Sequence, residues 1–101
     1  MSGRAIHDVE AERHRQVFEE GFIEQHDDLH DKGEMARAAA AYAIHSARFR
    51  DANEKEYRIK AAHPEWPWSR QWWKPKDRRR DLIRAAALII AEIERLDRMQ
   101  S

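Results

Sequence analysis

The segment from Asp77 to Arg98 constrains the fold of this chain more than any other, because apolar residues recur there without a Pro or Gly. Their spacing of three or four residues is typical of one face of an α-helix. The pattern predicts a central helix over 77–98 whose buried face carries Leu82, Ile83, Ala86, Ile89, Ile90, Ile93 and Leu96. Leu88 and Ala91 fall off this stripe and are expected to form a second contact surface. Replacing Ile89 by Asp is then expected to unfold the protein, because a lone buried charge is strongly unfavourable.

Two further segments have helical character. Residues 4–20 contain strong helix formers but only a weak apolar stripe, so this helix is expected to pack lightly. Asp31 followed by Glu34 resembles a capping box and predicts a helix over 31–50. The expected inward face of that helix is rich in alanine, which allows a neighbouring helix to approach closely, and it comprises Met35, Ala38, Ala39, Tyr42, Ala43, Ser46 and Phe49.

Prolines at 64, 67 and 75 interrupt regular helix between residues 63 and 76, where all four tryptophans of the chain also lie. Residues 52–62 are more polar and either form a further helix or connect to this loop. Nowhere does the sequence alternate between polar and apolar residues as a strand does. The sequence therefore predicts an all-α fold, in which residues 1–101 form one domain: a small bundle of three to four helices with an ordered Trp/Pro-rich loop.

Composition narrows the possible functions. Charged residues make up 38% of the 101 residues, yet 19 basic residues balance 19 acidic ones, and this neutrality argues against general nucleic-acid binding. A chain so short and so charged can build only a thin core, so we expect a homo-oligomer, most simply a two-fold dimer through the Leu88 surface. Cysteine is absent, which excludes disulfides, thiolate zinc sites and thiol nucleophiles.

The longest apolar stretch, residues 85–91, is much shorter than the roughly twenty residues needed to cross a bilayer. The first eight residues lack the apolar run of a secretory signal. We therefore expect a cytoplasmic protein without a membrane partner.

The first candidate site is the acidic turn that contains His26, Asp27, Asp28 and His30. Histidines four residues apart share a helical face, and the carboxylates beside them are of the type that binds divalent cations. Two other interpretations remain open. The turn could be a solvated cap of the following helix, or its aspartates could pair with arginines elsewhere in the chain.

The second candidate site is the segment of tryptophans and basic residues from Trp66 to Arg80. Indole rings offer flat faces for a nucleotide base, and Lys or Arg at a helix start contacts phosphate oxygens. In this hypothesis Trp72 and Trp73 stack on the base, whereas the phosphate is contacted by Lys74, Lys76, Arg79 and Arg80. The alternative is structural: the tryptophans close over the alanine-rich helix pair, and the arginines bond carboxylates such as Asp27 and Asp28.

Several strings of the sequence resemble an uncharacterised family of short helical proteins encoded in phage and prophage genomes. They are EQHDDLH at 24–30, GEMA at 33–36, WPW at 66–68, WWKPKD at 72–77 and the helix RRDLIRAAALIIAEIERLDR at 79–98. The similarity covers roughly residues 20–98, although Phe22 stands where the family has tryptophan and residues 52–62 follow no family pattern. Because small phage proteins often counter bacterial immunity, for instance by sequestering nucleotide signals, the resemblance implies a binding protein.

The sequence is therefore compatible with three functions. The leading hypothesis is a phage-type counter-defence protein that binds a phosphorylated, nucleotide-like ligand between the two candidate sites. The second is a metal-dependent nucleotide phosphohydrolase, in which Glu24, Asp27 and Asp28 would hold the metal. In a related arrangement, the pairs Glu24–Asp27 and Glu94–Asp97 would hold it together between facing helices. The third is an inhibitor that binds another protein. The sequence specifies no catalytic residue and no particular cofactor or metal, so binding is favoured over hydrolysis.

Overall fold

The computed structural model describes residues 3–20 and 27–100, and within them every regular element is helical, which confirms the all-α fold. The elements are α1 (Gly3–Glu19), α3 (Glu34–Arg48), α4 (Glu54–Ile59), the 3-10 turn η1 (Arg70–Trp72) and α5 (Arg78–Met99). The three long helices lie close to the ranges predicted at 4–20, 31–50 and 77–98. None of the helices described is long and apolar enough to cross a membrane.

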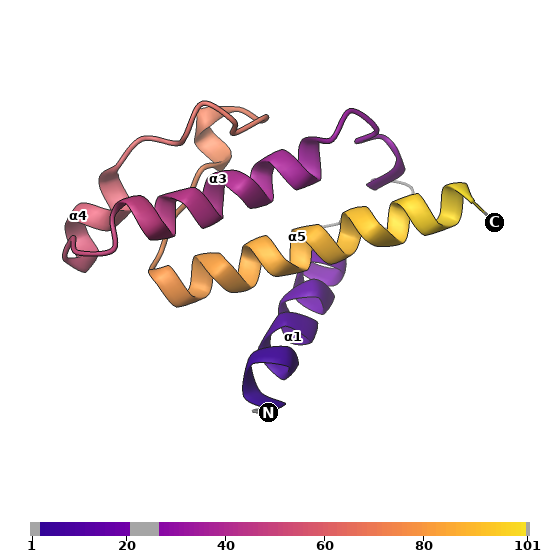
Figure 1. Cartoon of the computed structure of the whole chain (residues 1–101), viewed down its shortest axis with the longest axis horizontal. Helices are drawn as coiled ribbons and strands as arrows, with labels where there is room; N and C mark the ends of the chain where they lie inside the picture. Colours follow the sequence, from indigo (N-terminus) through magenta and orange to yellow (C-terminus); the bar gives the residue numbers. More distant parts are fainter. Residues whose placement is uncertain (1–2, 21–26, 101) are drawn as a thin grey trace.

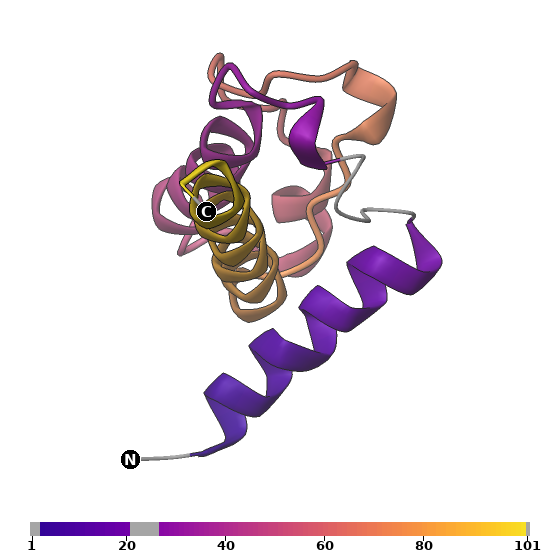
Figure 2. The ribbon, with the colours of Figure 1, turned by 90° about the vertical axis from the view of Figure 1, so that its right-hand side faces the viewer.

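The long helix α5 is the centre of the molecule, as the sequence predicted. It lies antiparallel beside α3, and α1 crosses it at a steep angle on another side (Figures 1 and 2). The segment between α4 and α5, which includes η1, passes over α3 (Figure 1). Both other long helices, α1 and α3, therefore pack on α5.

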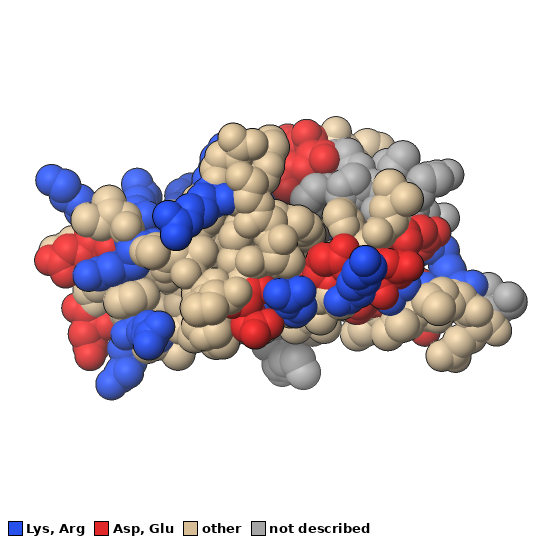
Figure 3. Space-filling model, turned by 90° about the horizontal axis from the view of Figure 1, so that it is seen from above, with Lys and Arg blue, Asp and Glu red and all other residues tan. Residues whose placement is uncertain are grey.

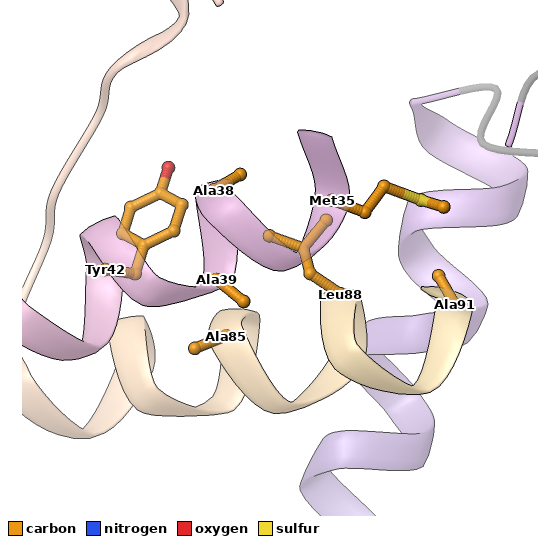
Figure 4. Packing of buried hydrophobic residues seen from close by; sticks show 7 residues of the cluster. All are labelled: Met35, Ala38, Ala39, Tyr42, Ala85, Leu88 and Ala91. Carbon is orange, nitrogen blue, oxygen red and sulfur yellow. The ribbon is translucent and has the colours of Figure 1, made fainter. Parts of the chain in front are cut away.

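The core lies between α3 and α5 and consists largely of small side chains (Figure 4). Its buried residues are Met35, Ala38, Ala39 and Tyr42 of α3 together with Ala85, Leu88 and Ala91 of α5. Alanine faces on both helices allow the backbones to come close together. The expected inward face of α3 is confirmed at its first four positions and at Ser46, and His45 is also buried there.

The predicted buried face of α5 is wrong at most of its positions. Leu82, Ile89, Ile93 and Leu96 are between 42% and 51% exposed, whereas Leu88 and Ala91 are at most 3% exposed. The α5 side of the core is instead built from small side chains, Ala85 and Ala91, with a single leucine, and alanines on α3 favour such small partners. Leu88 is therefore a core residue and not the surface for self-association that the sequence suggested.

The start of α3 also differs from the prediction. Gly33 precedes the helix at a φ of 80°, a left-handed conformation that favours glycine, and no side chain caps the helix there. Glu34 instead accepts a hydrogen bond from the Lys32 backbone N–H at 2.7 Å. At the start of α5, Asp77 is a true cap and accepts from the Arg80 N–H at 2.8 Å.

A buried polar contact attaches α4 to the helix pair. The Tyr57 hydroxyl donates to Asp81 Oδ2 at 2.7 Å, and the His45 Nε2 lies 2.9 Å from the Tyr57 carbonyl oxygen. Burial raises the pKa of the Asp81 carboxyl above its ordinary value. The contact fixes the chain just before the loop that carries the tryptophans.

Neighbouring residues of α5 provide a direct test of this packing. Leu88→Asp is expected to abolish folding, because it places a charge without a partner in the alanine-rich core. Ile89→Asp is expected to keep the helical circular-dichroism spectrum of the parent, because its side chain is about half exposed. Thermal unfolding followed by circular dichroism compares the two. If Ile89→Asp is unfolded and Leu88→Asp is folded, the buried face of α5 is the one that the sequence predicted.

Candidate functional site

A cleft of about 630 Å³ opens between the carboxyl-terminal half of α1, the tryptophan-rich loop and the α3–α5 pair. Its volume lies within the range of small-molecule sites. Its lining combines aromatic rings on one side with charged and polar groups of α1 on another, and it comprises Glu12, Arg15, Gln16, Glu19, Glu20, His30, Tyr42, Trp66, Trp68, Trp72, Lys74, Arg84 and Leu88.

The aromatic wall is held together by ring packing. Tyr42 of α3 stacks on Trp73 at a centroid distance of 4.8 Å, and Trp66 meets Trp73 edge-on at 5.0 Å. Trp68 in turn packs edge-on against Trp66 at 5.3 Å. The indole N–H of Trp66 donates to the Ser69 carbonyl oxygen at 3.1 Å. These contacts fix the loop against the core, so the wall is a preformed surface.

Trp72 differs from the other indoles because its side chain projects toward solvent. It is 59% exposed, and it lines the cleft together with Lys74. The Lys74 ammonium lies 6.0 Å from the centroid of the Trp72 ring. Among the described residues, no carboxylate pairs with Lys74. A flat apolar face and a cation without an ion-pair partner thus stand together at the edge of the cleft.

Arg84 and Tyr42 line the inner part of the cleft. The guanidinium of Arg84 donates to the Lys74 carbonyl oxygen at 2.6 Å and to Asp81 Oδ1 at 3.3 Å, and it lies 5.8 Å from the Tyr42 ring centroid. Burial raises the pKa of the Tyr42 hydroxyl. Arg84 therefore braces the loop, while Tyr42 stays neutral at physiological pH.

The α1 side of the cleft is built around a buried carboxylate. Glu12 is 1% exposed and accepts hydrogen bonds from Arg15 at 2.8 Å on each oxygen, and it also pairs with Arg80 of α5. Burial alone would raise the pKa of Glu12, but the hydrogen bonds from Arg15 and the charge of Arg80 outweigh it and lower that pKa. Gln16 donates to Glu12 Oε2 at 3.3 Å.

The amide oxygen of that same Gln16 is unusual. The side chain is 2% exposed and lines the cleft, yet its Oε1 has no hydrogen-bond partner among the residues that the structure describes. A buried acceptor without a donor is costly, on the order of 1–3 kcal/mol. The atom itself is closed to solvent, so it lies inside the wall that α1 contributes and not on the surface of the cleft.

The acidic turn contributes little to this cleft. His26 lies outside the described residues. Asp27 is buried and accepts from Arg13 at 2.9 Å, and Asp28 accepts from Arg98 at 2.8 Å. His30 does line the cleft, and its ring centroid lies 5.4 Å from that of Trp68.

The tryptophan segment divides between two places. Trp72 and Lys74 line the cleft, whereas Trp73 belongs to the aromatic wall and donates its indole N–H to the Lys60 carbonyl oxygen at 3.1 Å. The remaining predicted cations border a second hollow of about 380 Å³ beside α1: Lys76, Arg79 and Arg80. The structure thus brings His30, Trp72 and Lys74 together at the cleft, and of the other predicted site residues that it describes none lines the cleft.

Two arginines at the start of α5, Arg79 and Arg80, bond to carboxylates of α1, and not to Asp27 or Asp28. Arg79 donates to Asp8 at 2.7 Å, and Arg80 pairs with the buried Glu12. The sequence did not predict that α1 forms a wall of the cleft, because the apolar stripe of this helix is weak. The available signal was charge complementarity between the acidic first part of the chain and the basic run at 78–80.

Comparison of the chain with protein-family models, curated proteins and solved structures finds no match. The similarity to phage proteins therefore remains a prediction, and the cleft is the feature of the molecule that indicates a function.

The buried Glu12 gives the protein a specific pH dependence. Its pKa is lowered from 4.5 in the folded state, so ionised Glu12 stabilises the fold above about pH 4.5, and the contribution is lost as the pH falls through the lower, folded pKa. Glu12→Gln is therefore expected to reduce the free energy of unfolding at pH 7 by on the order of 1–3 kcal/mol. The difference from the parent should disappear in acid.

Urea unfolding between about pH 7 and pH 3 measures this difference. Glu10→Gln is the matched control, because Glu10 lies on the same helix but is exposed. A Glu12→Gln penalty that is the same at every pH would contradict the assigned role of the Glu12 charge.

Proposed function

We propose that the chain is a binding protein for a nucleoside monophosphate, whose base lies against Trp72 in the cleft and whose phosphate lies at Lys74. The observation that carries the proposal is the exposed Trp72 ring beside Lys74, a cation that no described carboxylate pairs with, at the edge of a cleft lined by further aromatic rings.

A planar ring is the part of the ligand that the aromatic wall supports. Indole rings stack on nucleobases with about 1–3 kcal/mol per base, and the exposed Trp72 has a face that its own chain does not cover fully. Trp66 and Trp68 extend the aromatic surface into the cleft. Because packing already fixes these rings, little ordering is needed when a ligand binds.

A single phosphate is supported by the charges around the cleft. Lys74 is a cation that no carboxylate of the described chain neutralises, whereas Arg15 bonds to Glu12 and Glu20 at 2.8 and 2.9 Å. Glu19 also lies 3.6 Å from Arg15. A triphosphate would extend toward these carboxylates and be repelled, so a monophosphate fits the charges better.

Charge on the outside of the molecule supports a small ligand over a nucleic acid. On the face seen in Figure 3, acidic side chains lie among the basic ones, both at the end that carries α4 and farther along the molecule. General nucleic-acid binding relies on a continuous basic surface.

The hydrolase alternative has less support. Asp27 and Asp28 each bond to an arginine, and Glu24 lies outside the described residues. Within residues 3–20 and 27–100, no group of three or more His, Asp or Glu side chains is arranged to hold a metal ion. A protein that binds a nucleotide without transforming it would act by sequestering it, and counter-defence, as the resemblance to phage proteins implies, belongs to this proposal.

The proposal is tested by titrating the protein with adenosine monophosphate and following tryptophan fluorescence. Saturable quenching is expected in the parent, with weaker binding by triphosphate. Lys74→Ala is expected to weaken monophosphate binding by about tenfold or more, because it removes a charge-assisted hydrogen bond. Lys55→Ala is the control, since Lys55 is exposed on α4 outside the cleft.

Adenosine without phosphate separates the two parts of the site. Its affinity should be the same for the parent and for Lys74→Ala, but should fall in Trp72→Ala. If cytosine, guanine and adenine monophosphates all fail to quench the parent, or if the Lys55 variant loses as much affinity as the Lys74 variant, the proposal is wrong.

A further inference from the structure

The outer face of α5 carries a row of apolar side chains that the chain itself does not cover. Leu82, Ile89, Ile93 and Leu96 are each 42–51% exposed, and Ala86 lies between the first two. We call these five residues the α5 stripe. Large aliphatic side chains gathered on one exposed face, rather than scattered, mark an interaction surface.

The position of the stripe on the helix explains why it is exposed. α3 packs on the side of α5 that carries Ala85 and Leu88, and α1 bonds to Arg80 and Glu94. In Figure 1, α3 lies above α5 and α1 passes behind it. The stripe occupies the remaining side of the helix, so a partner could reach it without displacing either neighbour.

The intervals along the stripe are four, three, four and three residues. This alternation, with a mean of 3.5, is the spacing at which one helix packs along another over several turns. The 22 residues of α5 form a rod about 33 Å long, and the stripe covers most of it. The matching occupant is therefore a second helix of similar length.

Charges beside the stripe indicate that this second helix is another α5. Arg78 lies before the stripe and Asp97 after it, both exposed, and neither has an ion-pair partner among the described residues. In an antiparallel pair of identical helices, the end of α5 that carries Arg78 lies beside the end of the other α5 that carries Asp97. A parallel pair would instead bring like charges together.

Side-chain sizes agree with the same arrangement. A two-fold axis beside Ile89 would place Leu82 of one copy near Leu96 of the other. The same axis would bring the small Ala86 near the large Ile93. Such a surface is complementary to itself, as a two-fold interface requires.

We infer that two copies of the chain associate through the α5 stripe as an antiparallel, two-fold homodimer. The residues that line the cleft lie on the sides of α5 that face α1 and α3, as Arg84 and Leu88 show. Each copy therefore keeps its own cleft accessible in the dimer.

Light scattering coupled to size-exclusion chromatography tests the inference at tens of micromolar protein. The parent is expected at twice the 12.0 kDa chain mass. Ile89→Asp is expected at the mass of one chain with its helical spectrum intact, because two carboxylates would meet at the axis. Ile59→Asp, which changes an exposed isoleucine of α4, is the control and should remain a dimer.

A charge exchange distinguishes the antiparallel pair from other contacts. Arg78→Glu alone is expected to weaken the dimer by several-fold, and adding Asp97→Arg to the same chain should restore it. A parent that is a monomer, an Ile89→Asp variant as dimeric as the parent, or a double variant weaker than Arg78→Glu would each overturn the inference. Nucleotide binding by the Ile89→Asp monomer is measured separately, so failure of the dimer leaves the proposed ligand testable.

Discussion

The close contact between two alanine faces, one on α3 and one on α5, is the constraint on which the other features of this structure depend. Ala38 and Ala39 of α3 belong to the same buried cluster as Ala85 and Ala91 of α5, and small side chains of this kind let two helices approach closely. Two consequences follow. Four large aliphatic residues of α5 are turned outward: Leu82, Ile89, Ile93 and Leu96. The aromatic ring of Tyr42 extends beyond the alanines, where the tryptophan-rich loop packs on it.

α1 is held by different forces from α3. Its buried residues are Glu12 and Gln16, and its connections to α5 include the ion pairs Asp8–Arg79 and Glu12–Arg80. Polar contacts are directional, so they specify the position of α1 more than they stabilise it. The same polar groups form one wall of the cleft opposite the indole rings. The cleft thus has one aromatic wall, formed by the tryptophan-rich loop, and one polar wall, formed by α1.

The sequence was sufficient to predict the helices and the inward face of α3, because spacing and helix-breaking residues are local signals. It failed for the face of α5, since the largest apolar residues were assumed to be buried, whereas the alanines of α3 select small partners. Of the residues predicted for the site, His30, Trp72 and Lys74 line the cleft, and their role in binding stays a prediction. Glu12 and Gln16 were missed because their burial depends on arginines that are distant in sequence, such as Arg80.

The central claim is that the cleft between the indole rings and α1 binds a base-like ring. Nuclear Overhauser effects between adenosine monophosphate and the protein measure this contact directly. The account predicts contacts from the base protons to the Trp72 and Trp68 rings, and none to the exposed Leu82 or Ile93 of α5. Contacts to the α5 residues, or no contact with either indole in a saturated sample, would contradict it.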